Sequence, residues 1–413
     1  MTTPIRSLSA LAAVGVAALA LAGCVAKTDP AATTGSGALA VTSTDTACDV
    51  SAATATSGTL SFDVTNSGSQ VTEFYLLADD GLRIVGEVEN IAPGAARSLT
   101  VVAQPGDYFT LCKPGMIGEG VGRAAFSVTG EKVTDTGDDA QQKQQAVTLY
   151  AAFVKDQVEQ LLPATQTFAE AYASGDDDAA REQFASTRAY YERIEPIAES
   201  LGDLDPQIDF REVDARADGI PWTGFHRIEK DLWVPEEDAL NSDGSSAWED
   251  WEPSTEAQRQ EYADGLVADV QELYDYVHST EFATALDEQG IAGISNGAIG
   301  LLDEVAQGKI EGEEDWWSGT DLWDFQANVE GSKNAFEIVR DFALATGDEG
   351  AALVAEIDEG YAGVEAKLAT YGSLDAGFVN YSEITDQDRR DLTDLINALA
   401  EPLSKLTSTI LEQ

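Results

Sequence analysis

Residues 147–168 read VTLYAAFVKDQVEQLLPATQTF, and the spacing of their side chains indicates the fold class of most of the chain. The core-facing positions recur every three or four residues, as in an amphipathic α-helix. They are Val147, Ala151, Val154, Val158, Leu161, Thr165 and Phe168. The same period returns at Leu392, Leu395, Leu399, Leu403, Leu406 and Ile410. Between these ends, helical periodicity recurs near 177–195, 256–280, 297–309, 321–345 and 348–371. The C-terminal region therefore predicts an all-α helical bundle.

The period changes upstream of this region. Leu60, Phe62 and Val64 alternate with polar residues, and a turn signal follows at 66–68. Several short strands separated by Gly and Pro turns predict a small all-β sandwich. We therefore expect a multidomain chain with the segments 1–24 (signal peptide), 25–43 (flexible tether), 44–130 (β-domain), 131–145 (polar linker) and 146–413 (helical domain).

The N-terminus has the layout of a secretory signal. Arg6 precedes an uncharged apolar run at 8–21, which is shorter than the about 20 residues of a membrane span. The run ends in Leu-Ala-Gly-Cys at 21–24, which resembles a bacterial lipobox. The resemblance implies that Cys24 receives a lipid and becomes the mature N-terminus. A plain signal peptide with an incidental cysteine is the alternative.

The charge of the chain is strongly negative. It carries 74 Asp and Glu residues against 24 Lys and Arg, a formal charge of −50. Repulsion of phosphates argues against a nucleic-acid partner. Such a charge attracts cations toward the surface, although a merely solvated acidic surface has the same composition. Only carboxylates that converge on one point would indicate a cation site.

Two further cysteines, Cys48 and Cys112, both fall in the expected β-domain. Paired cysteines in an exported domain usually form a disulfide. A metal or redox pair is the alternative, and the sequence leaves both open. Either arrangement predicts Cα atoms within about 7 Å of each other.

The candidate metal ligands begin with the motif at 223–230, which reads TGFHRIEK. On a helix, His226 and Glu229 are three residues apart and share a face. An imidazole beside a carboxylate can ligate a metal, while a surface His–Glu pair is the alternative. Glu192 and Glu195 share another helical face just before Pro196, which should end or kink that helix.

Further acidic residues, Asp209 and Asp321, lie in other segments. One histidine with several carboxylates describes an oxygen-rich site for iron, Mn²⁺ or Ca²⁺. Each acidic pair taken on its own is more typical of a solvent-facing role, and only the combination indicates a site.

Four blocks together resemble the imelysin, or M75 peptidase-like, domain. They are YERIEPI (191–197), GFHRIEK (224–230), GEED (312–315) and TDLWDFQANVEG (320–331). The preceding segment, with Ala-Cys-Asp at 47–49 and ENIAPG at 89–94, is similar to the cupredoxin-like domain of EfeO-type iron-uptake lipoproteins. It departs from that pattern in having Cys48-Asp49-Val50 where Cys-Glu-Pro is usual.

This resemblance implies a non-enzymatic, iron-binding lipoprotein on the outer face of the cytoplasmic membrane, periplasmic or cell-surface. Such a protein passes Fe²⁺ or Fe³⁺ to a membrane permease, alongside a haem peroxidase-like partner. His226 and Glu229 would be ligands of the primary site. Candidates for an additional cation site would be Glu192, Glu195, Asp209 and Asp321.

The same resemblance implies a site for copper or a second divalent cation in the β-domain. Its ligands would be Cys48, Cys112, Glu73, Glu87 and Glu89. The composition of the β-domain does not fit a blue-copper centre, because such centres use His ligands. The chain has two histidines, His226 and His278, and both lie outside the β-domain.

Two other functions compete with iron binding. A metal-dependent peptidase of the H-E-x-x-H type uses two His ligands and a Glu base, and this motif is absent from the sequence. His278 would have to reach His226 through folding. The third possibility is an acidic surface adhesion protein in which the carboxylates are only solvated.

Overall fold

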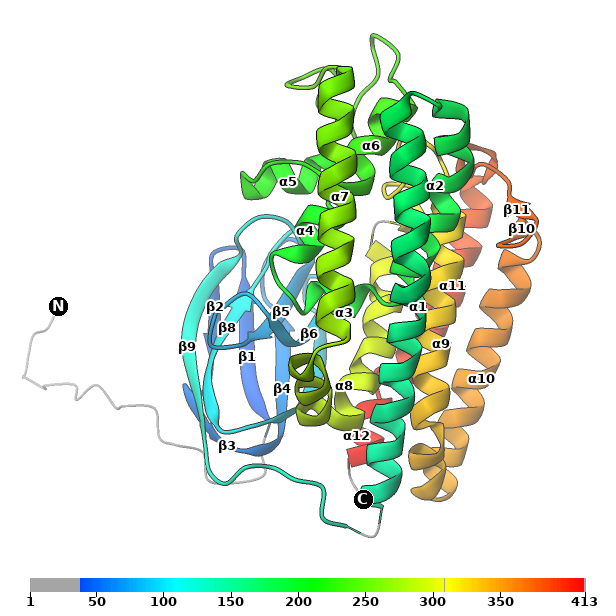
Figure 1. The fold of residues 1–413 in the computed structure, drawn as a ribbon. Helices are drawn as coiled ribbons and strands as arrows, with labels where there is room; N and C mark the ends of the chain where they lie inside the picture. Colours follow the sequence, from blue (N-terminus) through cyan, green and yellow to red (C-terminus); the bar gives the residue numbers. More distant parts are fainter. Residues whose placement is uncertain (1–37, 138, 308, 412–413) are drawn as a thin grey trace, which may run out of the picture. The chain divides into compact units, whose positions relative to one another are not determined.

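The computed structural model describes residues 38–137, 139–307 and 309–411. A β-sheet domain spans 39–129 and a helical domain spans 140–411 (Figure 1). This confirms the predicted fold class. Cys24 lies outside the described residues. Within the described part of the chain, no helix is both long enough and apolar enough to cross a membrane.

The β-domain is built from two sheets. One sheet has the order β2-β1-β4-β7 and the other β3-β9-β8-β5-β6. Phe62, Phe74 and Phe126 meet between them, with ring centroids 5.2 and 5.7 Å apart. The strands are β1 (Leu39–Thr44), β2 (Ala47–Val50), β3 (Thr54–Thr56), β4 (Gly58–Asn66), β5 (Thr72–Leu77), β6 (Ile84–Ile91), β7 (Ala96–Ala103), β8 (Gly106–Cys112) and β9 (Val121–Thr129).

The two sheets are joined covalently. Cys48 on β2 and Cys112 on β8 form a disulfide with a Cα–Cα distance of 5.4 Å. Both sulfurs are therefore engaged in the bond, and neither is a thiolate that could ligate a metal. Of the two alternatives for these cysteines, the structure has the disulfide and not a shared metal site.

The helical domain is a bundle around one apolar core. The long helix α1 packs against α2, α7 and α8, and α9 packs against α8 and α10. The helices are α1 (Ala140–Ser174), α2 (Asp177–Glu192), α3 (Glu195–Glu199), α4 (Leu204–Ile208), α5 (Glu212–Asp218), α6 (Gly224–Leu232), α7 (Glu256–Val277), α8 (Thr280–Gln307), η1 (Lys309–Glu311), α9 (Asp321–Ala345), α10 (Asp348–Leu368), η2 (Tyr381–Glu383), α11 (Asp386–Leu403) and α12 (Leu406–Leu411). A short hairpin, β10 (Gly372–Ser373) and β11 (Gly377–Phe378), precedes η2.

Two expected boundaries are wrong. The tether was expected to extend to residue 43, but β1 begins at Leu39, because Leu39 and Val41 alternate with exposed residues and pair with β4. The linker was expected at 131–145, but α1 begins at Ala140. The Gln-rich run that opens this helix contains no Gly or Pro, and Gln is a good helix former.

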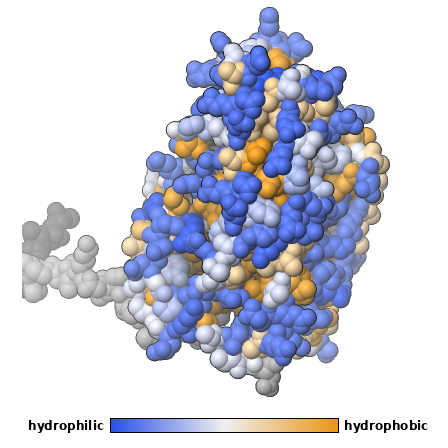
Figure 2. Space-filling view, viewed as in Figure 1, coloured by the Kyte–Doolittle hydropathy of each residue, from blue (hydrophilic) through white to orange (hydrophobic). Residues whose placement is uncertain are grey.

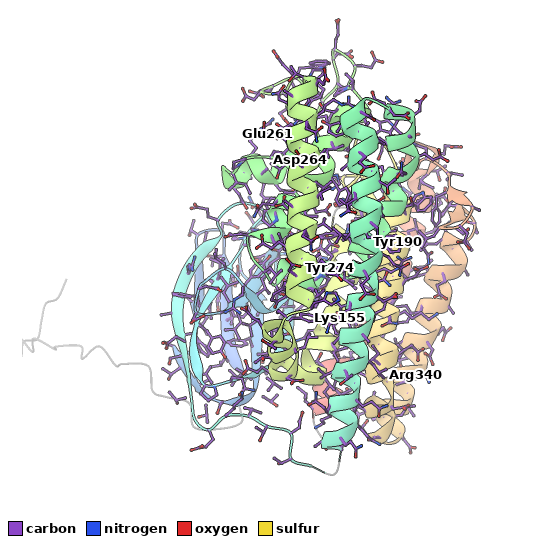
Figure 3. The ribbon with its side chains drawn as sticks, in the orientation of Figure 1. Lys155, Tyr190, Glu261, Asp264, Tyr274 and Arg340 are labelled. Atoms are coloured by element: carbon purple, nitrogen blue, oxygen red, sulfur yellow. A yellow bond between two sulfur atoms is a disulfide. The ribbon has the colours of Figure 1, made fainter. Side chains whose placement is uncertain are left out.

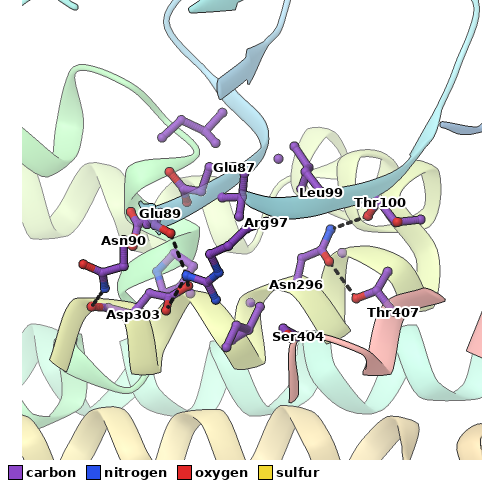
Figure 4. A pocket seen from close by; sticks show the side chains of 18 of the residues that line it. Glu87, Glu89, Asn90, Arg97, Leu99, Thr100, Asn296, Asp303, Ser404 and Thr407 are labelled. Carbon is purple, nitrogen blue, oxygen red and sulfur yellow. Dashed lines mark hydrogen bonds and ion pairs between the residues drawn. The ribbon is translucent and has the colours of Figure 1, made fainter. Parts of the chain in front are cut away.

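The β-domain and the bundle share an interface along α8. Strands β6 and β7 lie against this helix. Arg97 on β7 pairs with Asp303 on α8 at 3.0 Å, and the Asn296 amide donates to the carbonyl of Thr100 (Figure 4). These contacts border a cavity of about 900 Å³. On the face drawn in Figure 2, hydrophilic residues predominate, as the charge of −50 leads one to expect.

Candidate metal centre

The helix α6 positions the predicted ligand pair. His226 and Glu229 are 2% and 1% exposed, and His226 Nδ1 lies 3.1 Å from Glu229 Oε2. The helix starts at Gly224, which has φ +83°, and a Cβ there would lie 2.2 Å from the carbonyl oxygen of Ile208. This position therefore requires glycine. The close approach brings Asp209, at the end of α4, beside His226.

Four carboxylates surround the imidazole. On the Nε2 side, Glu314 Oε1 lies at 3.3 Å and Asp209 Oδ1 at 3.7 Å. On the Nδ1 side, Glu229 Oε2 lies at 3.1 Å and Asp315 Oδ1 at 3.8 Å. Each nitrogen thus forms a group of three ligand atoms close enough together to hold a metal ion. Imidazole and carboxylate are donors that suit iron and related cations.

The loop between η1 and α9 supplies Glu314 and Asp315. Glu229 holds this loop in place, because its Oε1 accepts hydrogen bonds from the backbone N–H groups of Trp317 and Ser318 at 3.1 and 2.8 Å. The other oxygen of Glu229 remains directed at His226. The carboxylate therefore has a fixed orientation of the kind that outer-shell hydrogen bonds give to metal ligands.

Arg188 on α2 is a fully buried cation at the middle of these acids. Its Nη1 pairs with Asp209, and its Nη2 pairs with Glu192 and, at 3.3 Å, with Glu314. Its Nε lies 3.5 Å from Asp315 Oδ1 and 3.6 Å from Asp324 Oδ1 without forming a hydrogen bond to either.

Glu192 and Glu195, two of the predicted cation ligands, surround a lysine. The Lys309 ammonium lies 2.7 Å from Glu192 Oε2 and 2.9 Å from Glu195 Oε2, with Asn328 Oδ1 at 3.0 Å. A cation is therefore already present there, supplied by the chain itself. The two glutamates remain near the centre without contacting His226 directly.

The other two predicted ligands lie on different sides of the histidine. Asp209 is on the Nε2 side. Asp321, at the start of α9, accepts a hydrogen bond from the backbone N–H of Asp315 at 3.2 Å. The four residues predicted for an additional cation site therefore do not form one site. Glu192 and Glu195 bind Lys309, Asp209 lies on the Nε2 side of His226, and Asp321 lies at the start of α9.

The charges of the cluster do not balance. Arg188 and Lys309 are buried among eight carboxyl groups, namely Glu192, Glu195, Asp209, Glu229, Glu314, Asp315, Asp321 and Asp324. Burying this many ionised carboxylates without further cations is very costly. The cluster must therefore take up protons or metal ions.

The pKa values of His226 and of two aspartates in the cluster are shifted in the direction that favours bound protons. Burial and the Arg188 charge act to lower the pKa of His226, but adjoining carboxylates outweigh them and raise it from 6.5 to about 10. Burial, and then the charge of Asp315, raise the pKa values of Asp321 and Asp324 well above their usual range. Without metal, the centre therefore holds protons near neutral pH.

We expect metal binding to release protons and the metal-free fold to lose stability as pH rises. A ligating His must be neutral and ligating carboxylates ionised. Because the folded-state pKa values of His226, Asp321 and Asp324 lie above the unfolded ones, their stabilisation is complete below the unfolded values. It is lost as pH rises, for His226 between 6.5 and about 10.

Calorimetry in buffers of different ionisation enthalpy would count the protons released per metal ion. Melting curves in chelator at pH 5, 7 and 9 would follow stability. The Asp321→Asn variant should lose less stability with pH than the wild type, since Asn cannot ionise. Equal pH dependence in the two proteins would contradict the assignment.

Two of the predicted small-domain ligands, Glu73 and Glu89, approach this centre, whereas Glu87 lines the cavity of about 900 Å³ beside α8. Glu73 and Glu89 are buried, and they line a cavity of about 150 Å³ together with Asp209 and Glu314. Burial raises the pKa of Glu73 to about 7, and burial followed by the charge of Glu304 raises that of Glu87 to about 8.

Several members of the centre were not predicted as site residues. Glu314 and Asp315 belong to the GEED block at 312–315, so the block that carried the family resemblance also carried this signal. Asp324 follows Asp321 by three residues within another such block. Arg188 and Lys309 had no comparable signal, since their role depends on tertiary contacts.

His278 takes no part in the cluster. It is bonded through Nδ1 to the carbonyl of Tyr274 at 2.8 Å and lies 3.3 Å from Glu159 through Nε2. Its ring stacks on Tyr274, which is labelled on α7 in Figure 3. The convergence of two histidines that a zinc peptidase site needs is therefore absent from the described residues.

Comparison with known proteins supports the same two-part organisation. The imelysin family model matches residues 146–406, and the cupredoxin-like domain model matches residues 15–121. The chain is 37% identical over 374 residues to proteins named iron uptake system component EfeO from Escherichia coli O1:K1 / APEC, E. coli strain K12 and Shigella flexneri, covering 90% of this chain and 90% of each relative.

A solved structure from Parabacteroides distasonis ATCC 8503, described in terms of iron regulation, has a TM-score of 0.48 and 16% identity. The match covers 67% of this chain and 96% of that one. The family model and the curated relatives together span both domains. The chain belongs to the imelysin family, in the two-domain, EfeO-type form with a cupredoxin-like domain before the helical one.

Proposed function

We propose that this protein is an exported iron-binding component of an Efe-type iron-uptake system, which captures iron and delivers it to a membrane permease. The observation that carries the proposal is the buried His226 with four carboxylates between 3.1 and 3.8 Å from its ring nitrogens. The relatives named as EfeO give the biological setting.

Iron suits this donor set better than the other common cations. The ligands are one imidazole and several carboxylate oxygens, with no thiolate, because the two described cysteines form a disulfide. Structural zinc sites use mainly Cys and His, whereas Ca²⁺ prefers six to eight oxygen ligands. Mixed nitrogen and oxygen donors accommodate iron. The carboxylates of the cluster carry enough negative charge to balance either Fe²⁺ or Fe³⁺.

A metal titration of the purified chain tests the function. We expect tight iron binding, measured by calorimetry under anaerobic conditions for Fe²⁺ and with a soluble chelate for Fe³⁺, and no cleavage of a peptide library. Metal-dependent cleavage would favour the peptidase alternative. Absence of both binding and cleavage would favour an acidic surface protein.

Delivery to a permease requires the protein to stay near the membrane. We propose that Cys24 is lipidated and that a haem peroxidase-like protein and the permease are its partners, as the resemblance to EfeO-type systems implies. The iron-binding centre would then lie on the outer side of the cytoplasmic membrane.

We expect Cys24→Ser to release the protein from the membrane or to block its processing. The serine hydroxyl cannot form the thioether that a lipobox cysteine carries. Fractionation of cells and a mass shift of the mature N-terminus would measure the change. If the variant remains in the membrane fraction with the mass of the wild type, the lipid anchor is not at Cys24.

A further inference from the structure

The carboxylates around His226 form two groups on opposite nitrogens of one ring. Asp209 and Glu314 face Nε2, whereas Glu229 and Asp315 face Nδ1. We propose that these are two alternative cation positions, an outer one at Nε2 where iron enters and an inner one at Nδ1 where iron is retained. The proposal rests on the iron-binding function and assigns the residues that hold the cargo.

The inner position has oriented carboxylates with unused oxygens. One oxygen of Asp315 accepts from the hydroxyl of Thr320, and one oxygen of Asp321 accepts from the backbone N–H of Asp315. The second oxygen of each has no hydrogen-bond partner among the described residues, and neither oxygen of Asp324 has one. With Glu229 held by its loop, the donors on this side are fixed before any cation arrives.

These unused oxygens are deeply buried. Asp315 and Asp324 are 0% exposed, and Asp321 is 1% exposed. Buried polar groups in native proteins are normally hydrogen-bonded, and exceptions call for an unseen ion, water or function. A carboxylate with one oxygen tied and the other free is the arrangement that outer-shell donors give to metal ligands. The inner group therefore indicates a cation rather than a packing defect.

The outer position differs in access and in charge. The Glu314 side chain is 11% exposed, and with Asp209 it lines the cavity of about 150 Å³. Both carboxylates also accept hydrogen bonds from Arg188, which neutralises part of their charge. A cation at Nε2 would thus be reachable but held more weakly than one at Nδ1, where Arg188 Nε lies 3.5 Å from Asp315 Oδ1 and 3.6 Å from Asp324 Oδ1 without a hydrogen bond.

The imidazole of His226 can bind a metal ion at only one of the two positions at a time. A neutral ring has one lone pair for a metal and one N–H. Iron at Nε2 leaves Nδ1–H to donate to Glu229 at 3.1 Å. Iron at Nδ1 leaves Nε2–H to donate to Glu314 at 3.3 Å. Movement inward exchanges one N–H for the other, with no net change in protons on the ring.

Anomalous diffraction at the iron edge from crystals of the full chain soaked in Fe²⁺ tests the assignment. In the wild type we expect the peak between His226 Nδ1 and Asp315. In Asp315→Asn, which changes a carboxylate of the inner group, we expect the peak to move to the Nε2 side and the iron affinity to fall by at least about 10-fold. In Glu314→Gln we expect the peak to stay at the inner position, while the rate of iron binding measured by stopped flow decreases.

Asp315→Asn separates a ligand from a merely protonated carboxyl, because Asn reproduces the shape and charge of the protonated form. Unchanged affinity and an unchanged peak in this variant, or a wild-type peak at Nε2, would overturn the inner position. Iron absent from both positions in the wild type would instead overturn the proposed function. Asp275→Asn, at an exposed position on α7, is the matched control and should behave as wild type.

Discussion

His226→Ala should lose most of the iron binding of the protein while keeping its helix content. Both candidate groups of ligands contain this ring and no other nitrogen donor. Changes to residues that only support metal ligands already cost about 10–100-fold in affinity. Removing the ligand itself should therefore weaken binding by more than about 100-fold, whichever nitrogen holds the metal.

Calorimetry with Fe²⁺ on the full chain measures the loss, and far-UV circular dichroism follows the fold. His226→Gln is a companion variant that keeps a polar side chain in the buried site. Glu229→Ala should lose affinity in the same direction, because it also releases the loop that carries Glu314 and Asp315. Glu359→Ala is the control, since Glu359 is exposed on α10 and an exposed charge contributes about 0–1 kcal/mol.

Unchanged iron affinity in both His226→Ala and Glu229→Ala would return the acidic clusters to the role of a solvated surface. A loss in Glu229→Ala with binding retained in His226→Ala would place the metal on carboxylates alone. These outcomes separate the contribution of the ring from that of the loop.

Periodicity predicted most helices because their stabilising contacts recur at fixed spacing. The stripe from Val147 to Phe168 lies inside α1, and all its expected core positions except Ala151 are buried. The part of α8 before residue 297 was missed, and it contains Gly290 and Gly293, which weaken a helical pattern. Gly290 has φ 60° within that helix, so the segment is kinked rather than regular. Local pattern therefore failed where tertiary packing decides the conformation.

The site was predictable only in part, for the same reason. His226 and Glu229 are neighbours on one helix, so spacing alone could pair them. Glu314 lies 88 residues from His226, and its only signal in the sequence was the GEED block at 312–315, which carries the family resemblance. Whether Glu192 and Glu195 face a metal or a lysine depends on Lys309, which is more than 100 residues away. Spacing along the chain contains no information about that contact.

The buried cations also explain how such an acidic core can fold before metal arrives. Arg188 and Lys309 provide two positive charges at its centre, and protons on His226 and the raised-pKa aspartates reduce the remaining imbalance. Metal and protons then compete for the same groups. Strong binding and a foldable metal-free state are therefore compatible.

We expect Arg188→Met to destabilise the metal-free protein severely. Methionine fills similar apolar volume but leaves Glu192 and Asp209 buried without their cation. Removing one partner of a buried ion pair costs about 3–5 kcal/mol. At about 2–4 °C per kcal/mol for a domain of about 150–250 residues, the melting temperature should fall on the order of 10 °C.

Differential scanning calorimetry in chelator measures this shift. Arg340→Met is the control, since Arg340 pairs with Asp358 at a partly exposed position, where an ion pair contributes about 0–1 kcal/mol. Added iron should restore more of the stability of Arg188→Met than that of Arg340→Met, because the metal supplies positive charge to the same carboxylates. A melting temperature for Arg188→Met close to that of Arg340→Met would mean that Lys309 and bound protons are enough to neutralise the cluster, and Arg188 would then not be needed to balance its charge.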